Sequence, residues 1–215
     1  NTLGNALTIS STIATGSNTV TKAGDGLLIL SGTNAYTGNT NLLAGTLRLS
    51  GASAQLGLPA ATTLTVVRQD ATLDVFAAGS SSLLYTGGPT LPLVALGALS
   101  GAGYLDNTST SNAAVSLGTA LSSSTTVFSG LIRNTGSGSL AVVRQGASGT
   151  LFLTGLNTYT GPTILSGTTV LGVTTLANGG LPSSIGASSN AASNLVFYGG
   201  TLQYTGANSY FAQFT

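Results

Sequence analysis

Apolar residues alternate with small or polar residues in two stretches of this chain, residues 26–51 and 149–172. The first reads GLLILSGTNAYTGNTNLLAGTLRLSG and the second reads GTLFLTGLNTYTGPTILSGTTVLG. A period of two is typical of a β-strand with one buried face. Each stretch therefore predicts three short strands separated by two corners.

The two stretches are copies of one motif, and the corners carry the closest match. Gly and Asn suit corners because they tolerate positive φ. A unit of this kind cannot bury its apolar face alone and needs further copies stacked above and below it, which predicts a β-solenoid. The predicted structural turn residues are Gly32, Asn34, Tyr36 and Gly38 in the first copy, and Gly155, Asn157, Tyr159 and Gly161 in the second.

These residues have specific expected roles. We expect Gly38 and Gly161 to occupy corners that either need positive φ or leave no room for a Cβ. The two asparagines are expected to form hydrogen bonds within their corners. The two tyrosines either pack at the turns or serve as platforms for carbohydrate. The alternation places six side chains in one continuous core: Leu28, Leu30, Leu47, Leu151, Leu153 and Val170.

The rest of the chain continues the series. The phrase Val-Val-Arg-Gln recurs in the segments that begin at Leu64 and Leu140, whereas residues 77–139 keep the pattern less well. No linker or change of composition divides the chain, so residues 1–215 are expected to form a single β-solenoid domain. At roughly 20–25 residues per coil, this length predicts about nine or ten coils.

The phrases SGTNAYTGNT and TGLNTYTGPTILSGTTVLG, with the tail ANGGLPSSIGASSNAASNLVFYGGTLQYTG, resemble the autotransporter-associated β-strand repeat. The resemblance is specific for residues 20–51 and 140–206. It implies an all-β, right-handed parallel β-helix that is exported and displayed outside the cell, at the bacterial outer surface. We expect a processed chain or a segment of a longer surface protein, because the sequence opens within the pattern and contains no Met.

Charge is scarce, with five Lys or Arg, four Asp and a net charge of +1. Without a basic cluster, a nucleic-acid partner is not expected. The longest apolar run, residues 91–99, is far below the roughly 20 residues of a membrane helix, so no membrane span is expected.

Without His or Cys, no Ser-His-Asp or Cys-His catalytic arrangement can form in this chain. The strongest enzymatic constellation comprises Arg68, Asp70, Asp74 and Arg144; the alternative is that these are surface charges at corners. We expect no catalytic, cofactor-binding or metal-binding residue. The sequon at Asn107 leaves glycosylation open.

Aromatic residues gather near the C-terminal end, where they could form an end contact or a cap. The predicted function is a non-catalytic stalk, spacer or adhesion surface of a secreted surface protein. Its expected partners are itself, or host and surface glycans and proteins. A filament subunit that stacks through its end coils and a polysaccharide-acting enzyme are the alternatives. The clustered aromatic residues are Phe197, Tyr198, Tyr204, Tyr210, Phe211 and Phe214.

Overall fold

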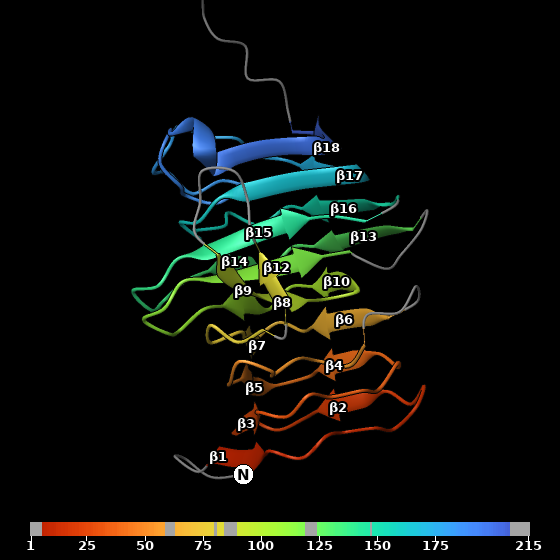
Figure 1. Ribbon diagram of the computed structural model, residues 1–215. Coiled ribbons are helices and arrows are strands. Elements are labelled where there is room, and N and C mark those ends of the chain that lie inside the picture. The colour runs from red at the N-terminus through yellow and green to blue at the C-terminus, as the bar shows by residue number, and fades with distance from the viewer. Residues whose placement is uncertain are drawn as a thin grey trace, which may run out of the picture.

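The computed structural model describes residues 6–58, 63–79, 81–83, 90–118, 124–146 and 148–206. Strands stacked in successive layers run from one end of the molecule to the other (Figure 1). Within these ranges the only helical element is η1 (Ala192–Asn194), a single 3-10 turn. The Gly-rich, β-branched composition matches this architecture, because such residues disfavour helices.

One side of the molecule is a six-stranded parallel sheet, in which strands distant in sequence lie next to each other. In spatial order it contains β1 (Ala6–Ile9), β3 (Leu27–Leu30), β5 (Gly45–Leu49), β7 (Ala71–Asp74), β11 (Tyr104–Asp106) and β14 (Leu131–Arg133).

A second sheet of twelve strands covers two further sides. Its strands pair in parallel, except that β8 is antiparallel to β9. The second side contains β2 (Val20–Lys22), β4 (Thr40–Leu42), β6 (Leu64–Val67), β10 (Ala98–Gly101), β13 (Thr125–Phe128) and β16 (Thr150–Leu153). The third side contains β8 (Ser81–Leu83), β9 (Leu91–Ala95), β12 (Ala113–Leu117) and β15 (Leu140–Arg144).

Two long strands join these sides at the C-terminal end. The first residues of β17 (Thr163–Val173) pair with β15, and its last residues pair with β16. The final strand, β18 (Leu195–Tyr204), pairs with β17 along both parts. Between β9 and β16 the chain visits the third, second and first sides in turn, and then repeats. The predicted parallel β-helix is therefore confirmed, while its number of coils stays a prediction.

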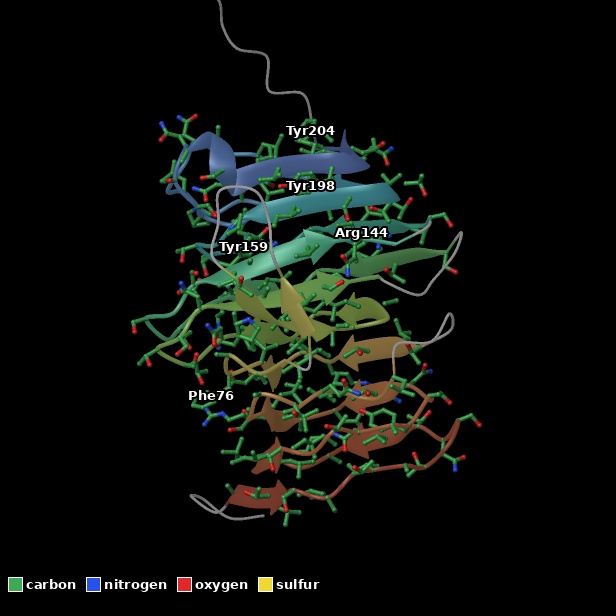
Figure 2. The ribbon with its side chains drawn as sticks, in the orientation of Figure 1. Phe76, Arg144, Tyr159, Tyr198 and Tyr204 are labelled. Atoms are coloured by element: carbon green, nitrogen blue, oxygen red, sulfur yellow. The ribbon has the colours of Figure 1, made fainter. Side chains whose placement is uncertain are left out.

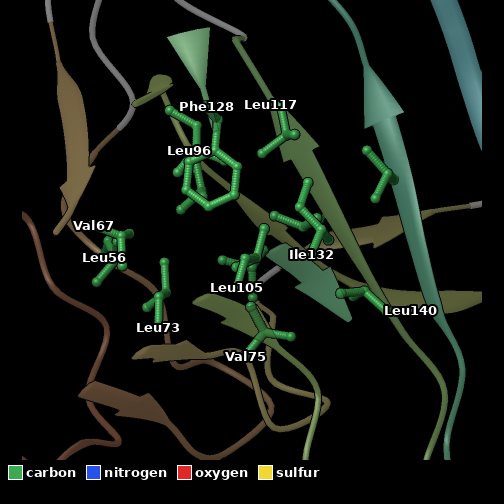
Figure 3. Close-up of a cluster of buried hydrophobic side chains, with 14 of the residues drawn as sticks. Leu56, Val67, Leu73, Val75, Leu96, Leu105, Leu117, Phe128, Ile132 and Leu140 are labelled. Carbon is green, nitrogen blue, oxygen red and sulfur yellow. The ribbon is translucent and has the colours of Figure 1, made fainter. Parts of the chain in front are cut away.

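The core lies inside these three sides (Figure 3). Along the six-stranded sheet, equivalent positions of successive coils are in register and form a ladder of aliphatic side chains: Leu28, Leu47, Leu73, Leu105 and Ile132. Each coil therefore covers the apolar layer of the previous coil, and this burial of apolar surface drives the stacking.

Five of the six predicted core residues lie in this core or against it, but Val170 does not. Val170 is half-buried, and its neighbours Leu171 and Val173 are buried instead. The reason is the alternation of the strand itself: Leu171 and Val173 are in register with the buried Leu151 and Leu153 of β16, so Val170 lies on the opposite face of β17. The confirmed residues are Leu30, Leu47, Leu151 and Leu153, which are buried, and Leu28, which packs against them.

Candidate functional site

Asn34 is buried in the first Tyr-Thr-Gly corner and binds the coils on both sides of its own. Its Oδ1 accepts a hydrogen bond from the backbone N–H of Ile13 at 2.9 Å. Its Nδ2 donates to the backbone oxygen of Gln55 at 2.8 Å. The side chain therefore links three successive turns of the chain.

Asn157 repeats this arrangement in the second corner. Its Oδ1 accepts from the N–H of Ile132 at 2.8 Å, and its Nδ2 donates to the oxygen of Ser184 at 2.8 Å. The expectation of bonds within the corner was wrong for both asparagines. Ile13 lies outside the strand ladders, and Ile132 lies in β14, the last strand of the six-stranded sheet. Their N–H groups therefore need partners other than a neighbouring strand, and these amides supply them.

Both motif tyrosines are buried, which excludes the carbohydrate-platform interpretation. The Tyr36 hydroxyl lies 2.8 Å from Thr40 Oγ1, and the Tyr159 hydroxyl lies 2.7 Å from Thr163 Oγ1. Burial raises the pKa of Tyr159 well above its usual value and also raises the pKa of Tyr36, because the phenolate would lose its hydration; the Thr hydroxyl bonds offset part of the effect. Figure 2 shows Tyr159 within the stack.

The motif glycines lie against the backbone of the preceding coil. A Cβ on Gly38 would lie 2.1 Å from the oxygen of Asn18, and one on Gly161 would lie 2.4 Å from that of Leu140. Neither glycine has positive φ. Glycine was expected at these corners either because of a positive φ or because there is no room for a Cβ, and the second reason applies. Gly32 and Gly155 also lie against preceding coils.

Sequence reasoning missed a second pair of glycines, Gly57 and Gly186. A Cβ on Gly57 would lie 2.5 Å from Tyr36 Cδ2, and one on Gly186 would lie 2.7 Å from Tyr159 Cε2. Each glycine therefore belongs to the coil that covers the tyrosine ring. The signal in the sequence is weak. Each glycine directly follows an apolar residue, as in Leu56-Gly57 and Ile185-Gly186, and lies one coil after its motif tyrosine.

Two ion pairs lie in the six-stranded sheet, toward the C-terminal ends of its strands, and one of them includes Asp74 of the predicted constellation. Arg48 Nε lies 2.8 Å from Asp74 Oδ2, and Arg133 Nε lies 2.7 Å from Asp106 Oδ2. Asp74 is in register with both Arg48 and Asp106, so the four residues follow one another from coil to coil. Each arginine also stacks on an aromatic ring, Phe76 for Arg48 and Tyr104 for Arg133.

The structure does not bring the predicted enzymatic constellation together. The buried Asp74 carboxylate binds Arg48 and also accepts hydrogen bonds from Thr108. Arg68 and Asp70 are exposed at a turn. None of these contacts involves Arg144, which lies on a different side of the helix.

Arg144 is buried and binds only carbonyl oxygens. Its guanidinium donates to the oxygens of Leu117 and Gly118 in the preceding coil, both at 3.0 Å, and to that of Gly149 at 2.8 Å. Lys22, at the corner before the first copy, donates to carbonyls in a similar way, including Ala44 at 3.0 Å. Burial lowers the pKa of both side chains. Both cations hold a corner together.

The sequon asparagine, Asn107, is fully buried. Its Nδ2 donates to the oxygens of Ser111, Gly138 and Ser139. The amide nitrogen is therefore not accessible for glycosylation in the folded chain.

The last coil presents large apolar side chains to solvent. On β18, Phe197 is 51% exposed, and Tyr198 and Tyr204 are 47% and 45% exposed. Figure 2 shows the two tyrosines at the last strands of the stack. Phe197 and Tyr204 are in register with the buried Leu165 and Val173 of β17, so they occupy core-facing positions of the last coil. The other predicted end-contact residues, Tyr210, Phe211 and Phe214, lie outside the described residues.

Among the described residues, no helix is long and apolar enough to cross a membrane. Comparison with known proteins gives two matches. Residues 20–53 and 142–181 match the family described as Passenger-associated-transport-repeat. The chain is also 42% identical, over 198 residues, to the Adhesin BmaC autotransporter of Brucella suis biovar 1 (strain 1330). The alignment covers 89% of this chain and 5% of that relative, so the chain corresponds to a small part of it. No solved structure matches.

Proposed function

Because the chain carries the repeat of autotransporter passengers, we propose that it is a non-catalytic β-helical segment of a bacterial surface protein that serves as a stiff stalk and adhesive surface. Its location is extracellular, at the cell surface. The matched relative is named an adhesin, which supports the adhesive part of the proposal.

The observation that carries the stalk role is the bonding between coils. Parallel strands pair from coil to coil along all three sides. Asn34 and Asn157 add bonds between coils where the chain turns, and Asn157 does so over β14, the last strand of its sheet. A solenoid built in this way transmits load through every coil, because each coil contacts only its neighbours. The geometry supports a mechanical and interfacial role.

The charged side chains support the non-catalytic part of the proposal. Asp74 and Asp106 are held in ion pairs, and Arg144 is enclosed by carbonyls. A general acid or base must reach a substrate proton. These groups are committed to the fold instead.

Beads coated with the purified chain would test the proposal. We expect the coated beads to adhere to cultured epithelial cells more than albumin-coated beads do, and the native chain to resist protease until it is thermally unfolded. Adhesion equal to that of albumin would remove the adhesive role. Rapid cleavage of the native chain would remove the stalk role.

A second candidate, a subunit that associates through its end coils, rests on the exposed core-facing side chains of β18. Such a surface favours association, because Tyr and Phe are enriched at interfaces. Sedimentation velocity over a hundredfold concentration range would test it. A monomer throughout would exclude this role.

A further inference from the structure

The loop of residues 174–194, between β17 and β18, is held in a fixed shape by its own hydrogen bonds. The N–H of Gly180 donates to the oxygen of Ser188 at 2.8 Å, which closes the loop on itself. The Asn194 amide donates to the backbone oxygen and hydroxyl of Ser189, at 3.0 and 2.8 Å. In Figure 1 the loop projects beside the last coils together with η1. Long ordered loops on a rigid scaffold are frequent binding sites.

This loop encloses a groove of about 480 Å³. The volume lies within the range of about 300–1,000 Å³ that is typical of sites for small ligands. Polar and apolar side chains both line it. The residues that define its chemistry are Asn178, Ser189, Asn190 and Asn194 on the polar part, with Ile185 and Leu195 on the apolar part.

The groove has no charged side chain in its lining. In the sequence, no charged residue follows Arg144. An ionic ligand would lose hydration without gaining a counter-charge, so the groove favours a neutral ligand. The exposed Asn178 and Asn190 offer amide donors and acceptors, and the half-buried Ile185 and Leu195 offer apolar contact.

The connection that forms this groove is longer than its counterpart in the first repeat copy. Leu56 and Gly57 are the counterparts of Ile185 and Gly186, because both glycines cover a motif tyrosine. The connection after β5, residues 50–63, is shorter than residues 174–194. The groove is therefore lined by a loop that is longer in the second copy than in the first.

We propose that this groove binds a neutral saccharide. A sugar ring combines hydroxyl groups, which pair with Asn amides, with apolar C–H surfaces, which pack against Ile185 and Leu195. This inference rests on the proposed surface function only because display outside the cell brings the groove within reach of glycans.

Saturation-transfer NMR on the full chain tests this, with the methyl glycosides of glucose, galactose, mannose and N-acetylglucosamine as probes. Sialic acid and a sulfated galactoside serve as charged comparisons. Asn178→Ala and Asn190→Ala each remove an exposed amide from the groove, and Ala191→Trp fills it from an exposed position in the lining. Gln69→Ala, which removes an exposed amide far from the groove, is the matched control.

We expect at least one neutral glycoside to bind, with an affinity that falls about tenfold in each Asn variant and is lost in Ala191→Trp. The control should bind as the parent does, and all variants should keep the parent's melting temperature. The proposal is overturned if no neutral probe binds, if charged probes bind better, or if Ala191→Trp binds unchanged. None of these results affects the stalk role, which is tested by proteolysis.

Discussion

The two repeat copies form the same contacts on different sides of the β-helix. In the first copy, β3 belongs to the six-stranded sheet. In the corner that follows, the N–H of Ala35 donates to the backbone oxygen of Ile13 in the preceding coil. In the second copy, the equivalent strand β16 belongs to the twelve-stranded sheet, and the corner lies over β14, where Thr158 donates to Ile132. The motif therefore does not specify a side.

What the two copies share is the relation to the coils before and after. Both asparagines accept from the preceding coil and donate to the following coil. Both tyrosines bond to a Thr four residues later. The motif acts as a connector between coils, both over an irregular segment of the preceding coil, as at Ile13, and over a strand, as at Ile132 in β14.

The copies differ in how deeply these contacts are buried. The bonds of Asn157 are buried, whereas those of Asn34 are partly buried. Because an unsatisfied buried group costs more than an exposed one, equal substitutions should have larger effects in the second copy. The following changes test this difference, from the largest expected effect to the smallest.

Arg144→Ala should lower the free energy of unfolding by about 3 kcal/mol or more, because several buried carbonyls lose their donor at once. Chemical denaturation would measure it. Arg68→Ala is the matched control, since Arg68 stands in the same Val-Val-Arg-Gln phrase but is exposed; it should change stability by less than about 0.5 kcal/mol. Equal effects of the two substitutions would contradict the carbonyl enclosure of Arg144.

Asn157→Ala should cost about 2–3 kcal/mol, and Asn34→Ala about 1–2 kcal/mol, because each leaves one N–H and one carbonyl unpaired. The same denaturation experiment compares them. If Asn34→Ala lowered the free energy of unfolding more than Asn157→Ala does, burial of the hydrogen bonds would not explain the difference between the two copies.

Gly161→Ala and Gly38→Ala should each cost about 1–3 kcal/mol, since the added Cβ would meet the backbone of the preceding coil. Here the two copies should respond alike. Gly26→Ala is the control, because a Cβ there meets nothing within 4 Å and its φ is not positive. If both corner variants had the same melting temperature as Gly26→Ala, the coils would have room for the added Cβ, and the close packing of these glycines would be contradicted.

Tyr159→Phe should cost about 1 kcal/mol at neutral pH through the lost bond to Thr163. Burial raises the pKa of Tyr159, so the folded phenol stays protonated where the unfolded phenol ionises. The contribution of the protonated Tyr159 to folding stability is therefore complete below about pH 10, the pKa of the unfolded phenol, and decreases as the pH rises above it. Denaturation at pH 8 and pH 11 should show a smaller alkaline loss for Tyr159→Phe than for the parent. An identical loss would contradict this.

Local pattern predicted the strands, the corners and a β-solenoid, because alternation and turn residues depend on neighbours in sequence, whereas the parallel β-helix was implied by the resemblance to a known repeat. It did not predict which charges meet. Arg48 and Asp74 pair only because the intervening coil brings them into register, and coil length cannot be read from either residue.

Identical phrases also have different environments. Arg68 and Arg144 both follow Val-Val, yet β6 ends before Arg68 while β15 includes Arg144. The first side chain is exposed and the second is buried. Val170 shows a different error: the prediction placed the inward face of the second copy one residue away from Leu171 and Val173, although the alternation of the strand marks these two as inward-facing.

Hydrogen exchange at the Ile132 amide tests the central claim, that the motif asparagines connect successive coils. Ile132 N–H has the Asn157 side chain as its acceptor. We predict that this amide is protected in the parent and exchanges at least tenfold faster in Asn157→Ala, while the N–H of Leu105, within β11 of the preceding coil, keeps its protection. Unchanged exchange at Ile132 in the folded variant would contradict the claim.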